Sequence, residues 1–129
     1  MNRAYVKGDW QQKRAFSPAV VTSGAGRTIW VAGHGAIKAD DGTSLAGDFE
    51  AQCRQVFRNL ERTLTQADAK LTDIVTMTVF VTDVRFTTRM TEIRTEIFGD
   101  NFPASAAVTV TGFAQPEMLI EIQCVAVTD

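Results

Sequence analysis

The chain has 129 residues, a length that fits a single domain over residues 1–129 with its own core. Its net charge is −2, from 13 basic and 15 acidic residues. It contains no basic run or stripe and no apolar stretch as long as a membrane span, so neither nucleic acid nor a membrane is an expected partner. Cys53 and Cys124 lie in apolar patterns without metal-ligand spacing and no signal peptide is evident, so we expect a cytoplasmic protein with buried thiols and no metal site.

The first third of the chain predicts short strands. Residues 3–6 favour one strand, and residues 19–22 (AVVT) and 28–32 (TIWVA) favour two more, since β-branched and aromatic residues dominate them. Gly24-Ala25-Gly26 lies between the last two and predicts a turn. We therefore expect residues 19–22 and 28–32 to form a hairpin.

A long amphipathic helix and a strand follow. Asp48 is the expected N-cap of the helix, because apolar residues then recur at helical spacing as far as Ala67. Residues 74–81 (IVTMTVFV) give the strongest strand prediction in the chain. Alternation would place one set of side chains on each face of that strand: Val75, Met77, Val79 and Val81 on one, and Ile74, Thr76, Thr78 and Phe80 on the other.

A second helix is predicted from a cap at Thr87 or Thr88 to about Phe98. Its expected inward residues are Met90, Ile93, Ile97 and Phe98. Residues 102–127 then predict two strands joined by a loop, and the second strand alternates strictly. One of its faces is wholly apolar: Met118, Ile120, Ile122, Cys124 and Ala126.

Glu121 is the unusual residue of this last strand, because it lies among aliphatic residues on the other face. Carboxylates in apolar surroundings gather at functional sites. A glutamate at the wet rim of a sheet gives the same pattern, so both interpretations stay open at this point.

The element order predicts an α+β fold in which two helices cover one face of a single sheet. The opposite face would carry residues too apolar to remain in water over such an area, which indicates self-association. These residues are Thr76, Thr78, Phe80, Leu119, Glu121, Val125 and Val127.

Taken in order and spacing, the segments resemble the RidA family, also called YjgF or the enamine/imine deaminase family. The matching segments are Val31-Ala32-Gly33-His34, Ala51-Gln52, Asp73-Ile74-Val75, Thr78 to Asp83, Phe102-Pro103-Ala104 and Ile120-Glu121-Ile122. The resemblance implies a chorismate-mutase-like fold and a homotrimer. In that assembly three sheets close into a central β-barrel with the helices outside, and a ligand cleft lies at each subunit interface.

The activity that the resemblance implies is hydrolysis of reactive imines and enamines to a keto acid and ammonia, without a cofactor. Glu121 matches the glutamate that orients water or moves a proton, and backbone groups near Gly33 match the wall of the cleft. As a structural alternative, Glu121 is a carboxylate held by backbone donors.

The chain departs from the small-amino-acid deaminases of the family at four cleft positions. Ser105 stands where those enzymes carry an arginine that grips the substrate carboxylate, a contact that serine cannot make. Ala107, Ala19 and Thr91 stand where they carry Cys, Tyr and Asn. The resemblance therefore points to a branch of the family without that arginine, and Ser105 is expected to serve as a hydrogen-bonding group rather than a nucleophile.

Four further side chains are candidates for the cleft. His34, the only histidine, suits acid–base chemistry or is a hydrogen-bonded rim residue. Arg27, Arg89 and Arg94 are candidates for a replacement anion clamp, with a solvated surface arginine as the alternative for each.

Two functions remain open from the sequence. The first is an imine or enamine hydrolase acting on a small molecule, with Glu121 positioning water and Ser105 and His34 offering hydrogen bonds. The second is a trimer that binds a small molecule or regulates without catalysis, which the loss of the arginine favours. The net charge of −2 argues against RNA cleavage in either case.

Overall fold

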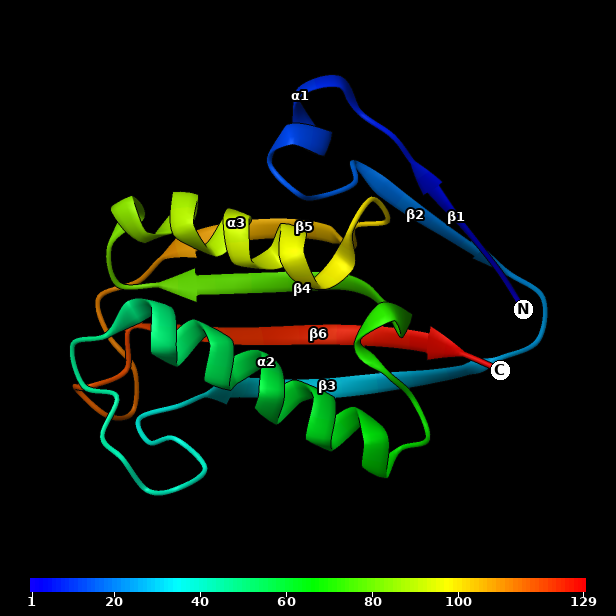
Figure 1. Ribbon diagram of the computed structural model, residues 1–129. Coiled ribbons are helices and arrows are strands. Elements are labelled where there is room, and N and C mark those ends of the chain that lie inside the picture. Colours follow the sequence, from blue (N-terminus) through cyan, green and yellow to red (C-terminus); the bar gives the residue numbers. More distant parts are fainter.

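Two β-sheets of unequal size organise the protein, and the computed structural model describes residues 1–129 (Figure 1). The predicted α+β class is confirmed, but the single sheet with two helices is not. A two-stranded antiparallel sheet lies beside a four-stranded mixed sheet, and there are three α-helices, because β1 and β2 pair with each other rather than with the larger sheet. The strands are β1 (Asn2–Val6), β2 (Ala19–Ser23), β3 (Arg27–Gly35), β4 (Ile74–Val81), β5 (Ala104–Thr109) and β6 (Ile120–Thr128). The helices are α1 (Asp9–Lys13), α2 (Phe49–Gln66) and α3 (Thr87–Phe98), with short 3₁₀ turns η1 (Leu71–Asp73) and η2 (Val84–Phe86).

The larger sheet has the strand order β3-β6-β4-β5. β6 is antiparallel to both of its neighbours, whereas β4 and β5 are parallel. A parallel pair needs a crossover connection, and α3 supplies it. Figure 1 shows α2 and α3 on the same side of this sheet, as the sequence predicts. The opposite side carries no helix and is called the open face below.

The predicted hairpin between residues 19–22 and 28–32 is wrong. β2 pairs with β1, and β3 pairs with β6. Gly26 shows why: a Cβ atom there would lie 2.9 Å from the carbonyl oxygen of Thr128, so the loop after β2 is held against the end of β6. The glycine-rich turn shows only that the chain changes direction after β2. The strand with which β3 pairs is set by the register with the longer β6.

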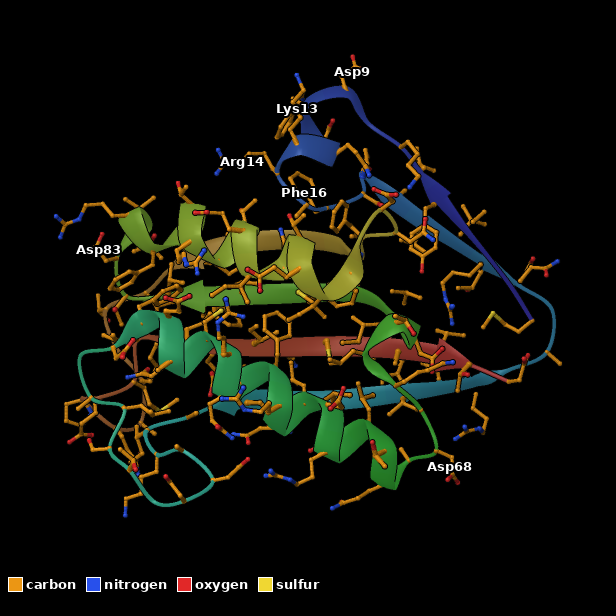
Figure 2. All side chains as sticks on the ribbon, in the orientation of Figure 1. Asp9, Lys13, Arg14, Phe16, Asp68 and Asp83 are labelled. Atoms are coloured by element: carbon orange, nitrogen blue, oxygen red, sulfur yellow. The ribbon has the colours of Figure 1, made fainter.

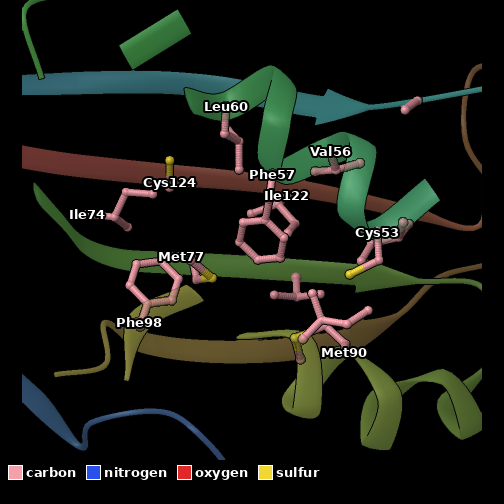
Figure 3. Packing of buried hydrophobic residues seen from close by; sticks show 14 of the residues in the cluster. Cys53, Val56, Phe57, Leu60, Ile74, Met77, Met90, Phe98, Ile122 and Cys124 are labelled. Atoms are coloured by element: carbon pink, nitrogen blue, oxygen red, sulfur yellow. The ribbon is translucent and has the colours of Figure 1, made fainter. Parts of the chain in front are cut away.

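The alternation predicted for β6 is confirmed. Ile120, Ile122, Cys124 and Ala126 are each at most 2% exposed and pack beneath the helices. Figure 3 shows Phe57 and Leu60 of α2 near Ile122, with Met90 of α3 farther away, across β4 from it. Burying a large aliphatic or aromatic side chain contributes roughly 1.5–3 kcal/mol, so the register of β6 is strongly specified.

One side chain of β4 lies on the other face from the one predicted. Ile74 was expected on the face with Thr76, but a β-bulge between them breaks the alternation. Ile74 is therefore in the core and 1% exposed, while Thr76 stays exposed on the open face. An extra residue in one strand switches the face to which the side chains beyond it point. The alternation of residue types in the sequence does not reveal such a bulge.

The N-termini of the two long helices, α2 and α3, are capped differently. The carboxylate of Asp48 accepts a hydrogen bond from the backbone N–H of Ala51 at 3.0 Å, so the predicted N-cap of α2 is confirmed. α3 is not capped by Thr87 or Thr88, because η2 runs directly into it. The hydroxyl of Thr87 donates instead to the carbonyl of Val84.

A buried glutamine fixes the loop that leads into β6. The Gln52 side-chain amide donates to the carbonyls of Leu45 and Glu117 at 3.0 and 2.8 Å, and its oxygen accepts from the Leu119 N–H at 2.8 Å. Gln52 is fully buried, so these bonds replace its contacts with water. The start of β6, and with it Glu121, is thereby held against α2.

The open face is partly apolar and carries the most exposed large hydrophobic side chain of the chain. Trp30 of β3 is 80% exposed and Val108 of β5 is 41% exposed. No helix of the chain has the length and apolar character needed to cross a membrane.

Replacing Asp48 with alanine should lower the free energy of unfolding by about 1 kcal/mol, because one N–H at the start of α2 loses its acceptor. Asp48→Asn is the matched control, since asparagine also caps helices, and it should remain within a few tenths of a kcal/mol of the wild type. Urea unfolding followed by circular dichroism measures both. Equal losses in the two variants would contradict the capping role.

Candidate functional site

Glu121 and Gly33 meet on the open face. Glu121 lies between Gly35 of β3 and Phe80 of β4 in the sheet register. The register of β3 shifts between Val31 and His34, which places two residues opposite Gln123 and forms a bulge at Gly33. A Cβ atom on Gly33 would lie only 2.9 Å from Cδ of Glu121 and 3.1 and 3.2 Å from its two carboxylate oxygens. The carboxylate therefore rests against backbone that only glycine leaves open.

The Glu121 carboxylate has no charged partner in the chain. It belongs to none of the ion pairs, although it is half-buried. Glu50 and Glu96, in contrast, pair with arginines on the helix surface. An unpaired carboxylate on a semi-apolar surface can accept a hydrogen bond from water or from a ligand.

A second group of predicted residues meets on the other side of the sheet, between α3 and β5. It surrounds a pocket of about 320 Å³, called the α3 pocket below. The pocket is lined by Arg14, Phe16, Thr87, Met90, Thr91, Arg94, Ser105, Ala106 and Ala107. Four of the predicted site residues are therefore brought together: Thr91, Arg94, Ser105 and Ala107.

Arg14 and Phe16 belong to this pocket and were not predicted. The segment that carries them is held to the edge of the sheet by Ser17, whose N–H donates to the Pro103 carbonyl at 3.0 Å and whose hydroxyl donates to the Phe102 carbonyl at 2.6 Å. Figure 2 shows Arg14 and Phe16 beside α3 and β5. The match of Ala19 to a cleft position was the one signal that this part of the chain lies near the site.

Arg94 is the most unusual residue of the α3 pocket. Its side chain is buried, with 2% of the residue exposed, yet no carboxylate pairs with it. Nη1 donates to the hydroxyl of Ser105 at 2.7 Å, Nη2 donates to the backbone carbonyl of Arg14 at 3.2 Å, and Nε has no partner. Burial lowers the pKa of Arg94 to about 10.

The other two arginines considered as clamps have structural partners. Arg27 donates to the carbonyls of Ala67 and Asp68 at the end of α2, at 2.9 and 3.0 Å, and so caps that helix. Arg89 pairs with Glu50 and with Glu92 on the helix surface. Arg94 is thus the one candidate of the three that is buried, and it has no carboxylate partner.

His34 lies on the helix side of the sheet, away from the Glu121 carboxylate. It faces Ile122 in the register, and the side chain of Ile122 is in the core. Its Nδ1 contacts the Ala32 carbonyl at 2.8 Å and its Nε2 contacts the Thr63 hydroxyl at 2.7 Å. Both ring nitrogens are engaged, so the geometry matches the hydrogen-bonded rim residue rather than an acid–base partner of Glu121.

The expected grouping of Glu121 with Ser105 and His34 is not assembled within one chain. Ser105 pairs with Met77, a core residue, and contacts α3, whereas Glu121 lies on the open face. β4 also separates β5 from β6. Residues opposite each other in register share a face, so the two groups lie on opposite sides of the sheet.

Neither cysteine takes part in these groups. Cys53 and Cys124 are buried free thiols, and burial raises the pKa of each to about 12. A thiol that stays protonated is a poor nucleophile. No group of histidine, cysteine and acidic residues in the structure is arranged to hold a metal ion.

Known proteins share this sequence and this fold. The family model described as Endoribonuclease L-PSP matches residues 10–128. A RutC family protein of Pyrococcus abyssi is 35% identical over 78% of this chain and 79% of its own. The human 2-iminobutanoate/2-iminopropanoate deaminase is 30% identical over 87% of this chain and 79% of its own.

Among solved structures, the Rid-family protein YyfB from Yersinia pestis superposes with a TM-score of 0.85 at 28% identity. The superposition covers 98% of each chain, so it includes β1, α1 and β2 as well as the larger sheet. The chain belongs to the Endoribonuclease L-PSP family, which is the RidA/YjgF family.

Proposed function

We propose that the protein hydrolyses the C=N bond of a small reactive imine or enamine, with Glu121 positioning the attacking water. The observation that carries this proposal is the unpaired Glu121 carboxylate, held against the backbone of Gly33 on a semi-apolar face. The name of the human relative, an imine deaminase, supports the same reaction class.

The chemistry requires one proton acceptor and little else. An imine is already electrophilic at carbon, so the reaction needs no cofactor, and an enamine reaches the same state when its carbon is protonated. Water adds to that carbon while the Glu121 carboxylate accepts a proton from it. The protonated Glu121 then returns this proton to the nitrogen of the carbinolamine, which expels ammonia as its hydroxyl loses a proton and becomes the carbonyl of the product. A carboxylate without a competing cation is available for this proton transfer.

The site would be completed between subunits of a homotrimer. Glu121 and the α3 pocket lie on opposite faces of one sheet, so a neighbouring copy is needed to bring a pocket to a carboxylate. The apolar open face, with Trp30 at 80% exposure, offers the surface for that contact. In the proposed assembly three open faces line a central β-barrel and the helices lie outside, in the chorismate-mutase-like arrangement.

A second candidate is a trimer that binds a small molecule without catalysis. The observation in its favour is Ser105, which stands where the deaminases of the family carry arginine. RNA cleavage, which the description of the family model names, is not favoured by a chain with a net charge of −2 and no basic stripe. A turnover assay distinguishes hydrolysis from binding alone.

Glu121→Gln should lower ammonia release by about a hundredfold or more, because general-base catalysis contributes at least that factor. Imines are generated from several amino acids by an amino-acid oxidase, and ammonia release is measured with and without the protein. Glu61→Gln, an exposed change on α2, is the matched control and should retain full activity. If the wild type does not accelerate ammonia release from any imine, the proposed hydrolase activity is contradicted. If the acceleration persists in Glu121→Gln, only the role of Glu121 is contradicted.

Gly33→Ala should reduce turnover strongly while leaving the fold intact. The added methyl group would meet the end of the flexible Glu121 side chain, which must move away from its position. We expect thermal unfolding within a few degrees of the wild type and a fall in the rate of ammonia release similar to that of Glu121→Gln. Full activity in a folded Gly33→Ala variant would show that the contact between the two residues does not matter.

The wild type should sediment at three times the 14.1 kDa chain mass at micromolar concentration. Trp30→Glu should shift it toward the monomer, because the new charge would be buried at the contact between open faces. Val84→Glu changes another exposed side chain, 63% exposed in η2, and should leave the trimer unchanged. Monomeric wild-type protein would contradict the assembly.

A further inference from the structure

The bulge in β3 needs support from outside its own strand ladder. Ala32 and Gly33 both lie opposite Gln123, and the extra residue of a bulge has no ladder partner of its own. Glycine is also the residue type with the widest choice of backbone conformations. The Glu121 carboxylate rests against this glycine, since a Cβ atom there would lie 2.9 Å from Cδ of Glu121. A mobile bulge would therefore leave the position of the carboxylate undefined.

The side chain of His34 reaches back across the bulge. Its Nδ1 lies 2.8 Å from the carbonyl oxygen of Ala32, the residue on the other side of Gly33. The covalent backbone and this hydrogen bond together close a short ring around the glycine. Ala32, Gly33 and His34 are thereby held in one conformation, although Gly33 itself has no side chain that could be packed.

The two partners of the imidazole determine where its hydrogen lies. A carbonyl oxygen only accepts, so Nδ1 must carry a hydrogen in order to bond to Ala32. In the neutral ring Nε2 is then the acceptor, and the Thr63 hydroxyl donates to it across 2.7 Å. If Nε2 is protonated, the hydroxyl accepts instead of donating, so the bond from Nδ1–H to Ala32 is kept in both states of the ring.

Helix α2 supports the residues that follow the bulge. Thr63 contacts the ring of His34, and Asn59, four residues earlier and so on the same side of the helix, donates to the Gly35 carbonyl at 3.4 Å. The helix is itself anchored in the core by Leu60 and Leu64, which are fully buried. Figure 1 shows α2 lying across β3. A chain of contacts therefore runs from the core, through His34, to the backbone beneath Glu121 on the opposite face.

We propose that His34 is a positioning residue: its Nδ1–H holds the Ala32 carbonyl and so fixes the β3 bulge against which the Glu121 carboxylate rests. The inference rests on the proposed function, to which it adds the only histidine of the chain in a role that needs no proton transfer. Because a catalytic group displaced by about 1 Å can lose about a hundredfold in rate, support of this kind bears directly on turnover.

The tautomer of His34 tests the first step without any turnover. The chain has one histidine, so long-range ¹H–¹⁵N correlation spectra of the uniformly labelled protein contain a single set of ring signals. With the ring neutral, these signals should show the Nδ1–H tautomer. Thr63→Val should move the Nε2 signal because the donor is lost, whereas Thr65→Val should leave it in place. Thr65 is the matched control, since its hydroxyl donates to the Glu61 carbonyl within the same helix.

Two substitutions of His34 test the second step. Leucine cannot donate to Ala32, whereas asparagine carries an amide nitrogen as far along its side chain as Nδ1 and can still do so. His34→Leu should lower kcat for imine hydrolysis by roughly tenfold to a hundredfold, with KM within about threefold of the wild type. His34→Asn should recover most of that loss. The ¹³Cδ signal of the Glu121 carboxylate should shift in His34→Leu and return toward its wild-type position in His34→Asn.

Any of three results would overturn the inference: an Nε2–H tautomer in the wild type, wild-type kcat in a folded His34→Leu variant, or His34→Asn impaired as much as His34→Leu. Thermal unfolding reports whether each variant folds. If His34→Leu does not fold, His34→Asn decides, and a tenfold or greater loss of its kcat counts against the role. If the wild type hydrolyses no imine, the proposed function fails, and the Glu121 ¹³Cδ signal still tests whether His34 positions the carboxylate.

Discussion

The packing of β6 beneath α2 and α3 determines which side chains of the larger sheet enter the core and which reach the open face. Its residues alternate, and the four on the helix side are almost fully buried under α2 and α3. A shift of one residue would bring Glu121 into the core and expose this apolar set, at a cost of several kcal/mol. Glu121 is therefore fixed on the open face by its neighbours. The Gln52 hydrogen bonds at the start of the strand hold it in the same register.

The parallel pairing of β4 and β5 has a different consequence, because it requires α3 as a crossover. The helix then lies across the edge of the sheet, and Arg94 on its inner side reaches Ser105. The N-terminal segment closes the pocket through Ser17. A cation is thus enclosed by a helix, the strand that follows it and an N-terminal loop far away in the sequence, and none of them supplies it with a carboxylate.

These two features divide the candidate site between the faces of one sheet. A carboxylate that can move a proton lies on one face, and a positive pocket lies on the other. One copy alone does not bring the two groups together, and in the proposed assembly a neighbouring copy does so. In the proposed function, Glu121 is the group assigned to the reaction.

The sequence was enough to predict the α+β class, the long helix from its Asp48 cap, the strand of residues 74–81, a last strand over residues 118–127, and the family. Periodicity and capping are local properties, and they identify Glu121 because it interrupts an apolar alternation. Strand pairing and side-chain surroundings are not local, so the partner of β3, the bulge at Ile74 and the helix-side position of His34 were decided only by the tertiary structure. The same holds for the arginines. Arg27, Arg89 and Arg94 look alike in the sequence, and only packing shows that one caps a helix, one pairs on the surface and one is buried without a counter-charge, because a charge acquires its role from what surrounds it.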